Sequence, residues 1–237
     1  MNTFASFIPE GYYHVYNQTN GKELLFKSDE NRRYFLQRFR NYLKPFHFVH
    51  SYALMSNHFH FSVQVKNEEQ ILEQISKIKV GERTKVMNEF LLVTNSILTN
   101  EKRTSEVSET SDVLNRLIIH QWQRFFLSYT KSFNKAHNRL GNLFRQKFKR
   151  SAYDPELKFQ YLQYYIHHNA RKHGIVNNFK DYKHSSYHEI INENDSLINI
   201  SKIFLWYSEI QEFISFHEGS HYEEVFENID LDGFIKK

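Results

Sequence analysis

The chain has no cysteine among its 237 residues. Disulfide-stabilised folds, thiolate nucleophiles and cysteine-based zinc sites are therefore excluded. Glycine and proline are scarce, with 7 and 3 residues, which excludes collagen-like and proline-rich chains. The sequence has no apolar run of ~18 residues and no basic-then-apolar stretch at its N-terminus. We therefore expect a soluble, cytoplasmic protein with no membrane partner.

Aromatic side chains, by contrast, are abundant, with 22 Phe and 15 Tyr. So much aromatic surface must be buried in a core or against a partner, which argues against a wholly disordered chain. The length suffices for one large domain or two small ones. By charge, the chain divides into a body, residues 1–187, and a tail, residues 188–237.

The formal net charge of +4 conceals a difference between body and tail. The body has 28 Lys and Arg against 16 Asp and Glu, whereas the tail has 3 against 11. The body is thus +12 and the tail −8. A strongly basic body is typical of a protein that binds a polyanion. The acidic tail is either a solvated appendage or a cover for the basic face, and we expect it to pack on or beside the body.

The local sequence patterns predict four strands and four helices. Aromatic and β-branched runs indicate strands, and apolar residues three and four apart indicate helices. The expected strands cover residues 11–18, 47–54, 59–65 and 143–153, and the expected helices cover residues 29–42, 68–95, 114–133 and 155–173. The polar residues 99–112 are expected to form a mobile loop inserted in the body.

This order of elements predicts an α+β fold. It contains the β-α-β-β-α-β order of a ferredoxin-like domain, an antiparallel sheet with helices on one face. The helix over residues 155–173 is an addition to that domain, and a helical tail follows it. The sequence has no P-loop, GxGxxG or HExxH motif, so we expect no nucleotide cofactor.

The first candidate for chemistry is the stretch Asn57-His58-Phe59-His60-Phe61. Side chains alternate along a strand, so His58 and His60 share one face while the two Phe side chains enter the core on the other. Two neighbouring imidazoles suit a first-row divalent metal ion. Two half-exposed strand histidines would give the same pattern, because the chain has 14 His.

The second candidate is the tyrosine-rich helix that ends in Tyr165-Ile-His-His-Asn169. Residues four apart share a helix face, so the Tyr165 hydroxyl and the Asn169 amide can point into the same space. The alternative interpretation is an amphipathic helix whose tyrosines merely pack on a sheet.

Together these motifs resemble those of the IS200-like, single-tyrosine HUH transposases, especially the REP-associated tyrosine transposases of bacteria. The similar segments are GYYHVYNQT, ALMSNHFHFSVQV, FNKAHNRLGNLFRQKFKR, YIHHNARKHGIV and DYKHSSY, in collinear order over about residues 10–187. Many members of the family have Arg at the position of Gln18, and Asn-Pro at the position of Asn169-Ala170.

The resemblance implies a DNA transposase-like HUH endonuclease. His58 and His60 correspond to the family's paired metal ligands, Asn169 to its polar third ligand, and Tyr165 to its nucleophile. The implied reaction cleaves and rejoins single-stranded hairpin or repeat-end DNA through a 5′-phosphotyrosine intermediate. The implied cofactor is Mg²⁺ or Mn²⁺, and zinc is also compatible with these ligand types.

A basic segment accompanies the two motifs. Residues 131–183 contain 12 Lys and Arg against 3 Asp and Glu, with aromatic residues interleaved. This mixture suits phosphate contacts and base stacking, although charges that only solvate a helix face would look the same. The candidate DNA-binding residues are Lys131, Lys135, Arg139, Arg145, Lys147, Lys149, Arg150, Arg171 and Lys172.

Two other functions fit the same residues. One is a stand-alone Rep- or relaxase-type nickase with the same chemistry. The other is a non-catalytic or domesticated regulator that binds single-stranded DNA or RNA with the same fold. The resemblance further implies a monomer, with a dimer as the alternative, associated with the bacterial nucleoid.

Overall fold

The computed structural model describes residues 3–21, 23–99, 106–145, 147–194, 197–219 and 222. The strands are β1 (Tyr12–Gln18), β2 (His47–Leu54), β3 (His58–Val65) and β4 (Lys149–Ala152). The longer helices are α1 (Asp29–Tyr42), α2 (Glu68–Ser76), α3 (Lys85–Thr99), α4 (Glu106–Ala136) and α5 (Pro155–Lys172), and the C-terminal part adds α6 (Tyr187–Ile191), α7 (Ile200–Ile203) and α8 (Ile210–Glu218).

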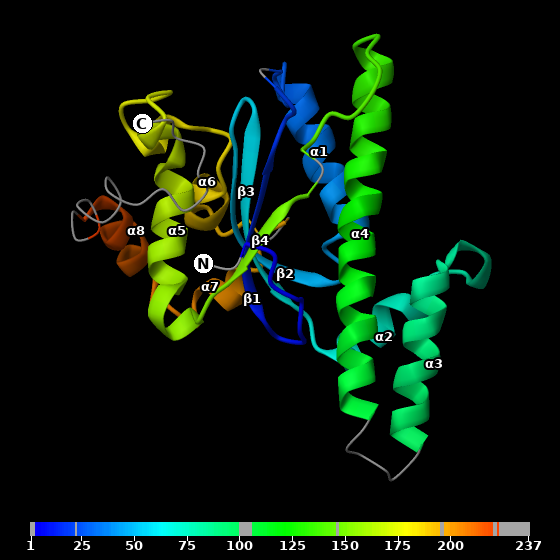
Figure 1. Cartoon of the computed structure of the whole chain (residues 1–237). Coiled ribbons are helices and arrows are strands. Elements are labelled where there is room, and N and C mark those ends of the chain that lie inside the picture. Colours follow the sequence, from blue (N-terminus) through cyan, green and yellow to red (C-terminus); the bar gives the residue numbers. More distant parts are fainter. Residues whose placement is uncertain are drawn as a thin grey trace.

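The four strands form one antiparallel sheet in the order β2-β3-β1-β4. Helices α1 and α4 cover one face of this sheet, and α5 lies on the opposite face (Figure 1). The predicted α+β fold is therefore confirmed, with two helices on one face and the additional helix on the other. We refer to the two sides as the α4 face and the α5 face.

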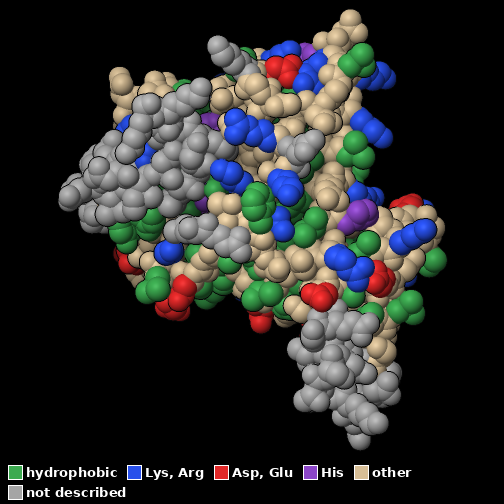
Figure 2. Space-filling view, viewed as in Figure 1, with side chains coloured by type: hydrophobic (Ala, Val, Ile, Leu, Met, Phe, Trp, Pro, Cys, Tyr) green, Lys and Arg blue, Asp and Glu red, His purple; other side chains and the backbone are tan. Residues whose placement is uncertain are grey.

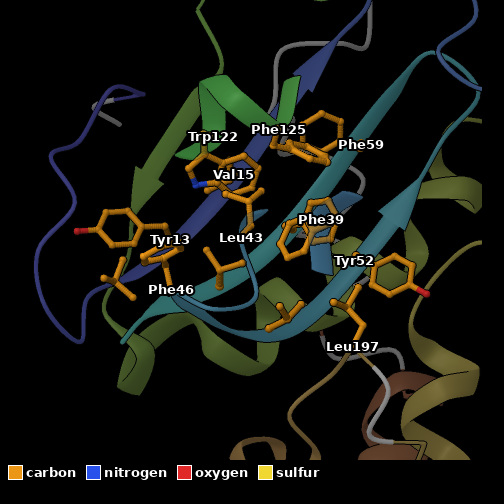
Figure 3. Close-up of a cluster of buried hydrophobic side chains, with 14 of the residues drawn as sticks. Tyr13, Val15, Phe39, Leu43, Phe46, Tyr52, Phe59, Trp122, Phe125 and Leu197 are labelled. Carbon is orange, nitrogen blue, oxygen red and sulfur yellow. The ribbon is translucent and has the colours of Figure 1, made fainter. Parts of the chain in front are cut away.

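The main core lies between the sheet and the α4 face helices, and it is largely aromatic (Figure 3). Phe39 of α1 stacks on Phe61 of β3 with ring centroids 4.3 Å apart, and Trp122 of α4 meets Phe39 edge-on at 5.7 Å. All three side chains are fully buried. Aromatic pairs in these geometries add stability beyond their buried area, so this core fixes the orientation of β3.

The helix that carries Tyr165 begins and ends at clear local signals. Asp154 caps α5, because its Oδ1 accepts a hydrogen bond from the Glu156 backbone N–H at 3.1 Å. Pro155 occupies the first helical position, where its missing N–H costs nothing. Gly174, with φ of 66°, terminates the helix by adopting the left-handed conformation.

Residues 68–95 do not form the single predicted helix. Helix α2 ends at Ser76, a 3-10 turn covers Val80–Glu82, and α3 begins at Lys85. Both helices bury apolar side chains, including Ile75 and Phe90. The apolar period thus continues across the turn, which hides the break from a sequence pattern.

The predicted mobile loop over residues 99–112 is wrong in part. Thr99 still belongs to α3, residues 106–112 begin α4, and residues 100–105 lie outside the described residues. Helices α3 and α4 pack side by side as an antiparallel pair (Figure 1). This packing stabilises a polar helical stretch that has little apolar pattern of its own.

The predicted edge strand over residues 143–153 is also shorter in the structure. Only Lys149–Ala152 pairs with β1 as a strand. Upstream, Phe144 and Phe148 turn toward Phe126 of α4, with ring centroids 4.8 and 5.4 Å away. Residues 143–145 nevertheless stay bonded to the end of β1 and the residues after it, because the Arg145 N–H donates to the Gln18 carbonyl at 3.0 Å and the Asn20 N–H to the Leu143 carbonyl at 2.9 Å. Packing on α4 thus interrupts the regular strand without removing these residues from the sheet edge.

The described part of the tail is integrated into the fold. Leu197, Ile203 and Phe213 are fully buried in the main core. The Asn199 Oδ1 accepts a hydrogen bond from the Val49 backbone N–H of β2 at 2.9 Å. Helices α6 to α8 thus cover β2 and the outer side of α5 (Figure 1). Among the described residues, no helix combines the length and apolar character needed to cross a membrane.

Candidate active site on the α5 face

His58 and His60 stand side by side on the α5 face of β3. Their ring centroids are 5.1 Å apart, and both side chains are buried. Across the sheet, His60 lies opposite Tyr16 and His58 opposite Gln18. Phe59 points to the α4 face and joins the core, as strand alternation predicts.

Each histidine has its Nδ1 engaged. His58 Nδ1 lies 2.7 Å from Asn57 Oδ1, which can only accept, so the N–H is on Nδ1 of His58. His60 Nδ1 lies 3.0 Å from Nε2 of His14, a buried residue of β1. Nε2 is then the ring nitrogen of each histidine that can face a cation.

Helix α5 brings Tyr165 and Asn169 over these histidines. It packs directly on β2 and β3. Asn169 Oδ1 lies 3.3 Å from His58 Nε2, and the Tyr165 ring centroid lies 6.1 Å from that of His60. The four residues singled out in the sequence, which span more than one hundred positions, therefore meet in one buried cluster.

The donor set of this cluster fits a divalent metal ion. With the His58 proton on Nδ1, its Nε2 and Asn169 Oδ1 are two lone-pair atoms that face each other, an arrangement a cation would relieve. No group of three His, Cys, Asp or Glu side chains suited to a metal occurs within the described residues. A metal site here therefore depends on the Asn169 amide as a third ligand.

The environment keeps the His60 and His14 imidazoles neutral. Burial and the neighbouring histidines hold the pKa of His60 well below its ordinary value, and burial lowers the pKa of His14 to about 3. Desolvation disfavours the charged imidazolium, and a metal ligand has to be the neutral form. Because burial keeps His14 neutral, its Nε2 can accept a hydrogen bond from the Nδ1–H of His60.

Of Tyr161, Tyr164 and Tyr165 on α5, Tyr165 is the one whose ring lies against His60 and His14. The Tyr164 ring stacks on His168 with centroids 3.9 Å apart and meets Phe216 of α8. Burial raises the pKa of Tyr161 to about 12, and its ring lies next to that of Tyr222. Helix geometry thus separates Tyr165 from the other two as the tyrosine of this site.

The candidate DNA-binding residues divide into two groups. Arg139 and Arg150 are tied into the fold: Arg139 Nε donates to Glu23 Oε1 at 2.6 Å, and Arg150 Nε donates to the Ala5 carbonyl at 2.7 Å. The others are exposed or half-buried on α4, near β4 or on α5, namely Lys131, Lys135, Arg145, Lys147, Lys149, Arg171 and Lys172. Among these, Lys172 has its Nζ 5.5 Å from the centroid of the Tyr165 ring.

Arg145 places its guanidinium beside Gln18, at the end of β1. With its amide oxygen turned toward Arg145, Gln18 accepts hydrogen bonds from Nε and Nη2, each at 2.8 Å. Gln18 pairs with His58 across the sheet. Arg145 is thereby held at the end of β1 that adjoins the candidate site.

Sequence reasoning missed two histidines of the cluster. His14 contacts His60, and the His173 ring lies 4.8 Å from that of His58. The alternation of β1 places His14 on the same face as Tyr16, so the sequence could have predicted the face of His14 but not its contact. The contact itself needs the β1–β3 register, which no local pattern specifies.

Comparisons with known proteins give one result. No protein-family model and no curated protein matches the chain. A solved structure described as "Structure of the REP associates tyrosine transposase bound to a REP hairpin" is similar at 15% sequence identity and a TM-score of 0.46, covering 83% of this chain and 87% of that one. At this level of similarity, the function of this chain has to be inferred from its own residues.

Proposed function

We propose that this protein is a metal-dependent, single-tyrosine endonuclease and strand transferase for single-stranded or hairpin DNA, of the HUH type that its motifs resemble. The observation that carries the proposal is the cluster on the α5 face. Asn169 Oδ1 opposes His58 Nε2 at 3.3 Å, and Tyr165, one helical turn before Asn169, packs against His60. A tyrosine nucleophile beside a neutral metal-ligand set is what phosphodiester cleavage by tyrosine needs.

His58, His60 and Asn169 would hold the cation, Mg²⁺ or Mn²⁺. When bound, such an ion neutralises the charge that develops on the non-bridging phosphate oxygens. All three ligands are neutral, so they would leave the ion's full charge available to the phosphate. His14 and Asn57 would keep the ligand nitrogens correctly oriented through their hydrogen bonds to Nδ1.

Tyr165 supplies the nucleophile in this proposal. Its phenolic oxygen forms a bond to the phosphorus while the bond between phosphorus and the 3′-oxygen breaks. The products are a 5′-phosphotyrosine link and a strand that leaves as a free 3′-OH, whose proton replaces the one that the phenol loses. Attack of a second 3′-OH on the link reverses the step and rejoins DNA. No nucleotide hydrolysis is required, because the number of phosphodiester bonds is conserved.

A second candidate function is favoured by one observation. The Tyr165 side chain is fully buried, as are His60 and Asn169. A phosphate reaches the phenolic oxygen only after neighbouring side chains move, Lys172 among them. A protein that binds DNA or RNA on this fold without cleaving it would need no such movement, and the buried cluster would then serve stability.

The test is adduct formation with a hairpin DNA selected for binding to this protein. The 5′-labelled and 3′-labelled hairpins are incubated with Mn²⁺, and denaturing gels report the covalent complex. We expect the wild-type protein to form a 5′-phosphotyrosine adduct and Tyr165→Phe to form none, which would also show that no other tyrosine replaces Tyr165. Tyr164→Phe, which loses a hydroxyl one residue away on another helix face, is the matched control and should retain the adduct.

His60→Ala separates chemistry from binding. We expect hairpin binding to persist while cleavage falls by at least ~10²-fold, because the metal-ligand set is broken. Transfer of the labelled strand to a second 3′-OH would distinguish a transposase-like enzyme from a simple nickase. Binding without any adduct under all divalent ions tried would reject the enzyme and favour the non-catalytic function.

A further inference from the structure

The α4 face carries a pocket that the proposed chemistry does not use. It has a volume of about 530 Å³, within the range of small-ligand sites. Asn17 of β1 lines it, and Asn17 lies opposite Phe59 in the sheet. The pocket is therefore on the opposite side of the sheet from His58 and His60, between α4 and the segment that precedes β4.

The walls of this pocket are aromatic. Phe126 of α4 packs against Phe144 and Phe148 with ring centroids 4.8 and 5.4 Å away, and all three rings line the pocket. Leu127, which is 55% exposed, adds an apolar side chain at the same wall. Phe144 and Phe148 are only 7% and 6% exposed, so the apolar surface that stays open to a planar ring comes mainly from the half-buried Phe126 and from Leu127.

Polar and basic side chains surround the aromatic walls. Gln123 and Asn142 contribute exposed amides, which can both donate and accept hydrogen bonds. Arg145 and Lys147 contribute exposed cations at the rim. Figure 2 shows Lys and Arg side chains gathered around hydrophobic ones on the face where β4 and α4 lie. No acidic side chain lines the pocket within the described residues.

We infer that this pocket binds one unpaired nucleotide of the DNA, with its base against the aromatic walls and its phosphate at the cationic rim. The inference rests on the proposed function, because it takes DNA as the ligand. An aromatic surface for the base, amides for its edge and cations for the phosphate are the combination that single-stranded nucleic acid needs. The volume holds a purine or a pyrimidine nucleotide.

The segment 147–150 links this pocket to the candidate active site. Lys147 and Arg150 line the pocket, whereas Lys149 has its Nζ 5.5 Å from the ring of Tyr16, which stacks on His14 on the α5 face. Cations of one short segment thus face both sides of the sheet. A strand that is held at its base in the pocket can follow these cations toward the α5 face, so the pocket would set which phosphate reaches Tyr165.

The test uses two probes that need no knowledge of the recognised sequence: a 20-nucleotide oligothymidylate and an abasic strand of the same length. We expect the wild-type protein to bind the thymidylate strand about tenfold more tightly than the abasic one, from base stacking. Leu127→Asp puts a carboxylate in the pocket and should reduce this ratio to about twofold or less. Leu92→Asp on α3, at a side chain 73% exposed and remote from the pocket, is the control and should keep the ratio.

Photocrosslinking of the wild-type protein with a 5-iodouracil strand provides an independent measurement that requires no variant. Crosslinked peptides that contain Phe126, Phe144 or Phe148 would support the pocket. Crosslinks confined to other segments, or equal ratios for Leu127→Asp and Leu92→Asp, would overturn it while leaving the Tyr165 adduct untouched. Failure of the wild type to bind either strand would also overturn the pocket, whereas the proposed function is decided separately by the Tyr165 adduct with the selected hairpin.

Discussion

At the scale of single residues, the candidate active site includes His14, a histidine outside the His58–His60 motif. His14 is buried beside His60, on the neighbouring strand, and its Nε2 lies 3.0 Å from His60 Nδ1. Ligand histidines commonly need such a partner to fix the ring and the position of its proton. Here the partner is another neutral imidazole, because burial suppresses its charge.

We therefore expect His14→Phe to weaken Mn²⁺ binding by about 10- to 100-fold. The ring volume is nearly kept, but His60 loses its hydrogen-bond acceptor. Titration of Mn²⁺ followed by electron paramagnetic resonance of the free ion measures the affinity without any need for activity. His50→Phe is the matched control: His50 is equally buried in β2 and contacts Tyr12 and Phe159 instead. Equal affinities of the two variants would contradict the positioning role of His14.

Much of the residue-level chemistry is visible in the sequence. The alternation of His58 and His60 with phenylalanines predicts their common face, and the spacing of Tyr165 and Asn169 predicts theirs. The burial of Tyr165 is not predictable in this way, because it depends on β3 beneath α5 and on Lys172 above the ring.

At the scale of elements, α5 is the decisive helix. It carries Tyr165 and Asn169, and its sheet contacts decide how far these side chains lie from β3. Its first turn is held by the Asp154 cap and by Pro155. The sequence signals at both ends explain why the predicted helix, residues 155–173, agrees with the observed one to within a residue.

We expect Asp154→Ala to lower the free energy of unfolding by about 1 kcal/mol, because the Glu156 N–H loses its acceptor. Urea denaturation followed by circular dichroism measures the change. Glu209→Ala is a suitable comparison, since Glu209 occupies the N-cap position of α8 without a side-chain cap hydrogen bond. Its effect should stay within a few tenths of a kcal/mol, or about that of an ordinary surface substitution. Equal losses in both variants would show that the cap is not the cause.

The α2–α3 region shows why other elements were predicted less well. An apolar period persists through a turn, so pattern alone joins two helices into one. Helix α4 is longer than predicted for a related reason. Its polar first turns are stabilised by α3, a contact between segments that no local window contains.

At the scale of the whole molecule, the acidic tail is part of the folded unit up to α8. In the core, Leu197, Ile203 and Phe213 of the tail pack with residues of the body, and the division of the chain at residue 187 stays a prediction. Removal of everything after residue 187 would expose β2 and α5 as well as change the charge. The charge difference between body and tail remains a property of the sequence, and its effect on DNA affinity has to be tested by substitution.

Buried histidines make the stability of the whole molecule dependent on pH. Burial lowers the pKa of His50 to about 3 and that of His47 and His217 to about 4, from an ordinary 6.5. Below pH 6.5 these histidines are protonated in the unfolded chain but stay neutral in the folded chain. This contribution to stability is therefore complete above pH 6.5 and is lost as the pH drops. Each such group contributes a loss of roughly 1 kcal/mol at pH 5.5.

We accordingly expect the free energy of unfolding to fall by a few kcal/mol, roughly 1 from each of these three groups, between pH 7.5 and pH 5.5. Urea titrations at the two pH values measure the difference. His50→Phe should reduce that difference by roughly 1 kcal/mol, whatever its effect on stability at pH 7.5. A difference that is the same in wild type and variant would mean that His50 is protonated in the folded state.

The sequence by itself determined which residues share a face and which parts of the chain are basic. Strand alternation and helix periodicity are local properties, so they suffice to pair His58 with His60 and Tyr165 with Asn169. The tertiary structure alone decided that these two pairs meet, that His14 lies beside His60, that Tyr165 is buried, and that aromatic and basic side chains form a pocket on the other face. Each of these depends on strand register or on packing between distant segments, and local patterns do not encode such long-range contacts.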